Sequence, residues 1–332
     1  MKVGFKSTID TTPNNQENSQ ENSGPIIISL PQNKDKNMES KFLIWHIEGG
    51  LGKNVAATSL ITQITEKYHD RKLIVVASYP EVFLNHPNVY RVYRVGVTSY
   101  FYDDYILGKD TLVFRHEAYF QTGHILKQKH LIENWCDLLG LEYRENTRPD
   151  LRLNMVQQQL VGGWARNKPI CLIQTNGGIL QNQKYNYTWT RDMPIDLAIH
   201  IASKFVNTHH IIQVTRPGSV QIPGAEIIDS PITAFELFSL VAASDIRILI
   251  DSCLQHVAAA YNLPSVVFWI GTTPKNFGYN LHHNIISLPP KGDTKLIDAY
   301  LFDYSFDGVL HECPYSNVNE MFDIDEIDRI LS

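Results

Sequence analysis

The sequence has no excess of positive charge and no long hydrophobic run. Its 332 residues include 29 Lys and Arg against 35 Asp and Glu, which gives a net charge of -6 at pH 7. A protein that binds nucleic acid mainly through the phosphates needs many surface cations, so nucleic acid is not an expected partner. A membrane-spanning helix needs about 20 successive apolar residues, and the sequence contains no such run. The composition therefore predicts a soluble protein without a transmembrane segment.

Cysteine is scarce, and its few residues are widely separated. Cys136, Cys171, Cys253 and Cys313 form no C-x-x-C pair. This spacing argues against a disulfide framework and a cysteine zinc site, and it is typical of a reducing compartment. The apolar segment at residues 25–30 is too short for the core of a signal peptide. We therefore expect a cytoplasmic protein without a metal site.

The first 40 residues are poor in apolar side chains and rich in Asn, Gln, Ser and Lys. Such a segment cannot bury enough apolar surface to offset the entropy that it loses on ordering. The sequence therefore predicts a disordered polar tail over residues 1–40.

After this segment, short apolar runs alternate with amphipathic stretches, which is the pattern of an α/β fold with parallel sheets. We expect strands at residues 42–47, 73–77, 88–93, 111–114, 170–174, 210–214, 246–250 and 265–270, and helices at 54–68, 130–139, 196–205, 232–243, 255–260 and 324–331. The pattern loosens between residues 148 and 163. We therefore predict two Rossmann-like domains that face a cleft, at residues 41–160 and 161–332.

The segment at residues 246–270 has the order of a βαβ unit. Asp251 and Ser252 follow its first strand directly, where a helix N-cap is expected, and Pro264 precedes its second strand. Ligands of parallel sheets bind beyond the carboxyl ends of the strands. Asp251, Ser252, His256 and Thr272 are therefore candidate ligand-binding residues. The alternative is that Asp251 only caps the helix and that His256 is a half-buried structural residue.

These residues carry a family resemblance. Asp251-Ser252, His256, Leu263-Pro264 and Gly271-Thr272-Thr273-Pro274 resemble the C-terminal signature of the heptosyltransferase-like glycosyltransferases of family 9, although the family has Gly where Cys253 stands. The resemblance implies the GT-B fold, with a nucleotide diphosphate sugar bound in the second domain as donor substrate and no cofactor. It implies metal-independent, inverting transfer of a heptose-like sugar to a glycan or lipopolysaccharide-type acceptor, including lipid-linked glycans. It also implies that the C-terminal helix packs back on the first domain.

Further donor-side candidates follow the strand expected at residues 170–174. Thr175, Asn176 and Gly177 end this strand, and the glycine backbone is suited to contact a pyrophosphate. Lys184 is a candidate cation for the departing diphosphate. The aromatic residues Tyr185, Tyr187 and Trp189 either stack on a sugar or base or belong to the core.

A glycine-rich turn at residues 48–54 follows the first expected strand and has two interpretations. In the first it is a variant P-loop of an ATPase, with Lys53 on a phosphate, although Asn54 stands where such loops have a Ser or Thr for Mg²⁺. In the second, Gly50, Gly52 and Lys53 form the acceptor-side loop of the family. The family usually has an Asp general base at the position of Lys53. An ammonium group cannot take the proton of an acceptor hydroxyl unless its pKa is strongly lowered, so Lys53 would instead bind an anionic acceptor.

A substitute base is expected at the end of another first-domain strand. Glu48, His116 and Glu117 qualify, as does His46, and we favour Glu117 because Arg115 and His116 lie beside it in the sequence. The alternative for Glu117 is a surface ion pair with Arg115. The missing Asp also leaves open a non-catalytic glycan- or nucleotide-binding relative.

Overall fold

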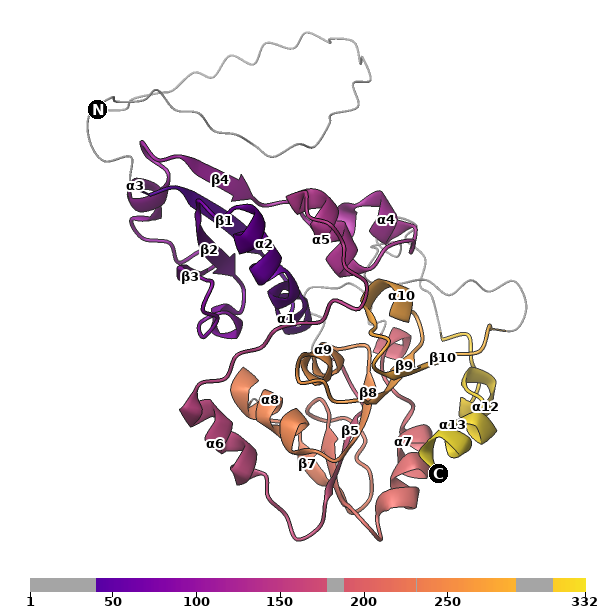
Figure 1. Ribbon diagram of the computed structural model, residues 1–332. Coiled ribbons are helices and arrows are strands. Elements are labelled where there is room, and N and C mark those ends of the chain that lie inside the picture. The colour runs from indigo at the N-terminus through magenta and orange to yellow at the C-terminus, as the bar shows by residue number, and fades with distance from the viewer. Residues whose placement is uncertain (1–39, 178–187, 231, 291–312) are drawn as a thin grey trace, which may run out of the picture.

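The computed structural model describes residues 40–177, 188–230, 232–290 and 313–332. The predicted tail lies outside these ranges except for Ser40, and so do Lys184, Tyr185 and Tyr187. Within them the chain forms two parallel sheets with helices packed on their faces (Figure 1).

The first sheet has the strand order β3-β2-β1-β4, and neighbouring strands are parallel. Its strands are β1 (Phe42–Ile47), β2 (Lys72–Ala77), β3 (Arg91–Arg94) and β4 (Thr111–Phe114). The central strand β1 is a near-continuous apolar run because both of its faces are covered. Leu43, Trp45 and Ile47 lie in the main core, and Phe42 and Ile44 lie in a smaller cluster on the other face.

The helical segments around the first sheet are mostly short. They are α1 (Leu51–Ala57), η1 (Thr58–Leu60), α2 (Ile61–Lys67), η2 (Pro80–Val82), α3 (Phe101–Tyr105), η3 (Ala118–Phe120), α4 (Thr122–Ile125) and α5 (Leu131–Leu139), where η denotes a 3₁₀ helix. The single helix expected at residues 54–68 begins earlier and is interrupted by η1. Trp135 of α5 packs edge-on against Trp45 of β1, with ring centroids 5.9 Å apart, and so anchors α5 on the sheet.

The second sheet has six parallel strands in the order β10-β9-β8-β5-β6-β7. They are β5 (Ile170–Gln174), β6 (His210–Val214), β7 (Glu226–Ile228), β8 (Ile246–Ile250), β9 (Val266–Trp269) and β10 (His283–Ile286). The two edge strands β7 and β10 were not predicted. Each is short and only partly buried, so neither has a clear apolar run.

The helices of this half are α6 (Met155–Gly163), η4 (Thr188–Thr190), α7 (Ile195–Phe205), α8 (Ala234–Ala243), α9 (Cys253–Ala260), α10 (Pro274–Phe277), α12 (Val318–Met321) and α13 (Ile324–Leu331). Helix α6 lies where the sequence pattern loosens, and it was not among the predicted helices. It buries none of its residues and therefore lacks apolar periodicity, but Asn154 and Gln157 form a capping box at its start. Helix α6 packs against α8 of the second sheet.

The C-terminal helix packs on the second domain, which corrects the expectation that it returns to the first (Figure 1). Ile327 is fully buried in the same apolar cluster as Ile201 of α7. The Asp328 carboxylate lies 2.8 Å from both His200 Nε2 and Lys204 Nζ of α7. Helix α13 therefore contacts α7 through both an apolar and a charged side chain.

Two close contacts join the domains. Helix α1 packs against α9, and α10 lies below α4 and α5 in Figure 1. The Asn276 amide at α10 donates to the carbonyl oxygens of His124 (3.3 Å) and Lys129 (3.2 Å). The carboxyl end of the first sheet is therefore held against the start of α9.

Candidate functional site

The turn after β1 is held together by its own side chains. Gly49 has φ of +107°, a conformation that favours glycine, and its N–H donates to Ser78 Oγ at 3.1 Å. The Asn54 amide donates to the carbonyl oxygens of Gly50 (2.9 Å) and Gly49 (3.3 Å), and the Asn54 side chain is fully buried. Asn54 is therefore committed to the turn, and the P-loop interpretation has no support from this geometry.

Lys53 and Glu117 form an ion pair across the first domain. The Lys53 side chain is only 6% exposed, its ammonium group lies 4.6 Å from the centre of the Tyr119 ring, and Glu117 Oε1 accepts a hydrogen bond from Tyr119 N at 3.1 Å. Burial lowers the pKa of Lys53, while the Glu117 carboxylate acts in the opposite direction. The pair holds the Glu117 carboxylate in a fixed position with one face toward solvent.

This pair lies in the wall of a cavity of about 290 Å³. The lining residues come from the turn after β1 and from the segment after β4, and they are His46, Ile47, Glu48, Lys53, Arg115, His116, Glu117, Tyr119, Phe120 and Trp135. The three predicted catalytic candidates therefore share one cavity. Arg115 pairs with Glu48 at 3.2 Å and not with Glu117, so the surface pair considered for Glu117 is not formed. Of the carboxylates that line this cavity, Glu117 is the one held in place by the buried Lys53.

Gly52, next to the cavity-lining residue Lys53, lies where the first domain contacts the second. A Cβ atom at Gly52 would lie 3.2 Å from Cys253 Cα and 3.1 Å from His256 Cδ2. Such distances are tighter than nine in ten real Cβ contacts, so the absence of a side chain at Gly52 permits the close approach of α1 to α9. Lys53 is the next residue, and the Lys53–Glu117 pair is thereby adjacent to the start of α9.

His256 is buried at this domain contact. It is 5% exposed, its Nδ1 lies 2.8 Å from the Tyr279 hydroxyl, and the Gln255 amide lies 3.1 Å from its Nε2. Burial lowers the pKa of His256 to about 3, with smaller contributions from His130 and His282. At neutral pH His256 is therefore an uncharged hydrogen-bonding group.

Asp251 does not cap α9, which corrects one of the two roles considered for it. Ser252 is the N-cap residue, and it makes no side-chain capping bond to the described first turn. Asp251 is only 4% exposed, and neither its Oδ2 nor the buried Thr272 hydroxyl has a hydrogen-bond partner among the described residues. Burial raises the pKa of Asp251, whereas Arg191 and Thr272 nearby act in the opposite direction. A buried polar group without a hydrogen-bond partner destabilises a fold, and a ligand that bonds to it removes this penalty.

The loop after β5 is hydrogen-bonded to other residues of the protein. Gly177 N donates to Asp192 Oδ1 (3.1 Å) and the Asn176 amide donates to Asp192 Oδ2 (2.9 Å), while the Thr175 hydroxyl accepts from the Gln213 amide (2.9 Å). The Gly177 N–H, which was expected to be suited to contact a pyrophosphate, is therefore already hydrogen-bonded to Asp192. Asp192 also pairs with Arg216.

Three charged residues beside this loop were not identified from the sequence: Arg191, Asp192 and Arg216. Arg216 follows β6 by two residues, so the rule that selected Asp251 after β8 could have found it. Arg191 is buried, and its guanidinium carbon lies 3.4 Å from the Cβ position of Gly177. These are the cations that the described part of the chain places beside the loop after β5.

No group of three or more His, Cys, Asp or Glu residues in the described ranges is arranged to hold a metal ion. In the same ranges, no helix has the length and apolar character needed to cross a membrane.

Comparisons with known proteins give the fold. No protein-family model matches the chain, and no curated protein sequence matches it. A family 9 glycosyltransferase from Veillonella parvula DSM 2008 is 11% identical and superposes with a TM-score of 0.59 over 89% of this chain and 98% of its own.

Two further structures agree with this result. The ADP-heptose LPS heptosyltransferase II of E. coli is 12% identical, with a TM-score of 0.53 over 79% of this chain and 94% of its own. The iron-containing heptosyltransferase TibC of enterotoxigenic E. coli, in complex with ADP-D-β-D-heptose, is 17% identical, with a TM-score of 0.51 over 78% of this chain and 65% of its own. The expected architecture is confirmed: the chain has the GT-B-like fold of the family 9 heptosyltransferases.

Proposed function

We propose that the chain is an inverting, metal-independent glycosyltransferase that transfers a sugar from a nucleotide diphosphate sugar to a hydroxyl group of a glycan. The observation that carries this proposal is the position of the Lys53–Glu117 pair. It lies in a cavity of the first domain, next to the start of α9 in the second. An acceptor in that cavity would face a donor bound beyond β8.

In this mechanism Glu117 is the general base. Its carboxylate takes the proton of the acceptor hydroxyl, the oxygen attacks the anomeric carbon, and the bond to the nucleotide diphosphate breaks with inversion. Lys53 pairs with Glu117 and holds it in place, so Lys53 is a positioning residue and is not available for an anionic acceptor. The carboxylate that the family has on α1 would here be supplied from the segment after β4.

The donor would bind at the carboxyl edge of the second sheet. Asp251 and Thr272 offer buried polar atoms there, and Arg191 adds a positive charge for the departing diphosphate. His256 is uncharged, and both of its ring nitrogens lie within hydrogen-bond distance of protein groups, the Tyr279 hydroxyl and the Gln255 amide. Ser252, Asn176 and Lys184 stay predicted donor contacts. The ADP-heptose in the TibC complex supports a heptose-like donor, and a glycan or lipopolysaccharide-type acceptor is the matching acceptor class.

A thermal-shift panel of ADP, GDP, UDP and their sugars tests the donor half of the proposal. A ligand at one hundred times its Kd stabilises the native state by about 2.7 kcal/mol. We expect one nucleotide diphosphate to raise the melting temperature of the wild type and to do so much less for Asp251→Asn. A panel without any shift contradicts a nucleotide-sugar transferase.

A transfer assay with the best donor and EDTA tests the catalytic half. Turnover that persists in EDTA is expected, whereas activity that is lost and then restored by Mn²⁺ overturns the metal-independent mechanism. Donor binding with no turnover toward any glycan acceptor would instead identify a non-catalytic nucleotide-binding relative.

A further inference from the structure

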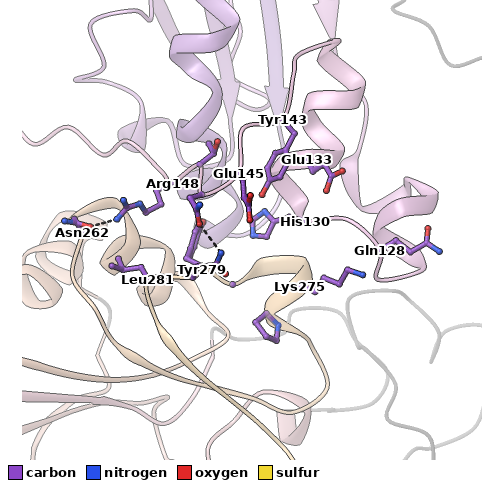
Figure 2. A pocket seen from close by; sticks show the side chains of 15 residues that line it. Gln128, His130, Glu133, Tyr143, Glu145, Arg148, Asn262, Lys275, Tyr279 and Leu281 are labelled. Atoms are coloured by element: carbon purple, nitrogen blue, oxygen red, sulfur yellow. Dashed lines mark hydrogen bonds between the residues drawn. The ribbon is translucent and has the colours of Figure 1, made fainter. Parts of the chain in front are cut away.

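A second cavity, of about 690 Å³, lies between the two domains (Figure 2). The first domain contributes residues of the α4–α5 segment and the chain that follows α5, and the second contributes α10 and the loop before β10. The lining residues are Gln128, His130, Glu133, Tyr143, Glu145, Asn146, Thr147, Arg148, Asn262, Pro274, Lys275, Gly278, Tyr279, Asn280 and Leu281. None of them lines the cavity around Glu117.

Several polar groups in this groove have no partner in the described part of the protein. Within those ranges, the side chains of Gln128, Tyr143, Glu145 and Lys275 form no hydrogen bond and no ion pair, although all four line the groove. Two hydrogen bonds connect the walls of the groove. Arg148 bonds to Asn262 (Figure 2), and Asn280 donates to Asn146 Oδ1 at 3.0 Å. The groove therefore has fixed walls and hydrogen-bonding groups that a ligand can use.

The charges in the groove exclude several classes of ligand. Glu133 and Glu145 balance Arg148 and Lys275, so the groove has no excess of positive charge for a phosphate or a polyanion. The lining is dominated by charged, amide and hydroxyl side chains, which do not suit a lipid chain. The fitting ligand is nearly neutral and carries many hydroxyl groups.

The aromatic rings define this ligand further. Tyr143 lines the groove with a partly exposed ring, whereas Tyr279 in the opposite wall is only 5% exposed and has the His130 ring 5.7 Å away between centroids. Aromatic rings pack on the apolar faces of sugars, while planar amides and carboxylates hydrogen-bond to hydroxyl groups. We propose that this groove is a second, non-catalytic glycan-binding site that holds a neutral or amino-sugar oligosaccharide between the two domains.

This site goes beyond the proposed transfer reaction, because it uses neither Glu117 nor the donor edge around Asp251. Its volume lies within the range of about 300–1,000 Å³ of small-molecule pockets and suits a short segment of a few sugars. Because its two walls belong to different domains, the bound glycan would also link them.

The test is binding of the intact chain to a printed array of neutral, amino-sugar and uronic-acid oligosaccharides, followed by titration of the best binder. We expect binding to neutral or amino-sugar members. We expect Tyr143→Ala and Glu145→Gln each to weaken it at least tenfold. Glu142→Gln removes the same charge three residues away, outside the groove, and should bind like the wild type.

The proposal is overturned if no array member binds the wild type, or if Tyr143→Ala and Glu145→Gln bind the best glycan as well as the wild type does. The melting temperature is measured on the same variants and should match that of the wild type, which shows that they are folded. A failure of the donor panel with the wild type would contradict the transferase alone, because glycan binding in the groove requires no nucleotide.

Discussion

The ammonium group of Lys53 pairs with the carboxylate of Glu117, and the residue before Lys53 touches the other domain. The resemblance to family 9 leads one to expect an Asp carboxylate on α1, at the position of Lys53. In this chain that position carries a positive charge instead. A carboxylate is still present, but it reaches the site from the segment after β4.

Glu117→Gln should abolish most of the turnover and leave donor binding intact. Loss of a general base lowers kcat by about 10²- to 10⁴-fold. Glu81→Gln is the control, because Glu81 pairs with Arg94 away from the cavity. Steady-state kinetics and the melting temperature are measured together, since the substitution at Glu117 leaves the buried Lys53 without its anion. A Glu117→Gln enzyme with wild-type kcat would remove this residue from the mechanism.

The position of the carboxylate can be tested by moving it. In a Glu117→Ala background, Lys53→Asp returns an acidic group to α1 and removes the unpaired cation. We expect the double variant to regain a measurable part of the activity that Glu117→Ala loses. Lys53→Asn in the same background is the control without a carboxylate, and equal activities of the two double variants would contradict the idea.

Gly52→Ala should destabilise the contact between the domains. Helix propensity alone favours Ala by about 0.5–1 kcal/mol, but the added methyl overlaps the Cys253 backbone, and overpacking of this kind costs about 1–3 kcal/mol. The overlap should dominate because a backbone atom cannot rotate away. Gly50→Ala is the control, since its Cβ would meet no atom within 4 Å. Urea unfolding of both variants decides whether the two substitutions differ as expected.

Asp251→Asn should stabilise the fold and weaken the donor complex. Burial raises the pKa of Asp251, so its negative charge at neutral pH destabilises the native state. Removal of that charge should therefore increase the free energy of unfolding. The lost carboxylate should reduce affinity for the nucleotide diphosphate by about tenfold, or 1.4 kcal/mol. Calorimetry and thermal melts give both numbers, and a variant that melts lower but binds normally would show that Asp251 is a structural residue.

Stability should fall as the pH drops from 6.5 toward 4. Burial lowers the pKa of His124 and His282 to about 4 and that of His256 to about 3, so the unfolded chain takes up protons in this range before the native state does. Each such group contributes a slope of up to about 1.4 kcal/mol per pH unit. His256→Gln should flatten the profile of unfolding free energy against pH. Substitution of the exposed His69 by Gln should not change it.

Most of the strands could be predicted because they are short apolar runs, and β1, β5 and β8 are also buried on both faces. β1, β4, β5, β6 and β8 were predicted with the bounds that the structure has. The edge strands β7 and β10 and the helix α6 were missed, because exposed elements carry no apolar periodicity. The capping pair Asn154 and Gln157 was the available signal for α6.

The site was predictable only in part. Its residues could be assigned to strand ends, and the structure places Glu48, His116 and Glu117 in the lining of one cavity. The partner of each side chain depends on contacts between distant segments, such as the 64 residues between Lys53 and Glu117. For the same reason the sequence did not reveal that Asp192 takes the N–H of Gly177.

The order of the strands along the chain has a consequence for synthesis. Every described strand of the first sheet precedes residue 115, and every described strand of the second follows residue 169. Domains generally fold as units, with the N-terminal one first as the chain leaves the ribosome. The first sheet can therefore form before the second has been translated. The contact of Gly52 with Cys253 can form only after the β8–α9 segment has been synthesised.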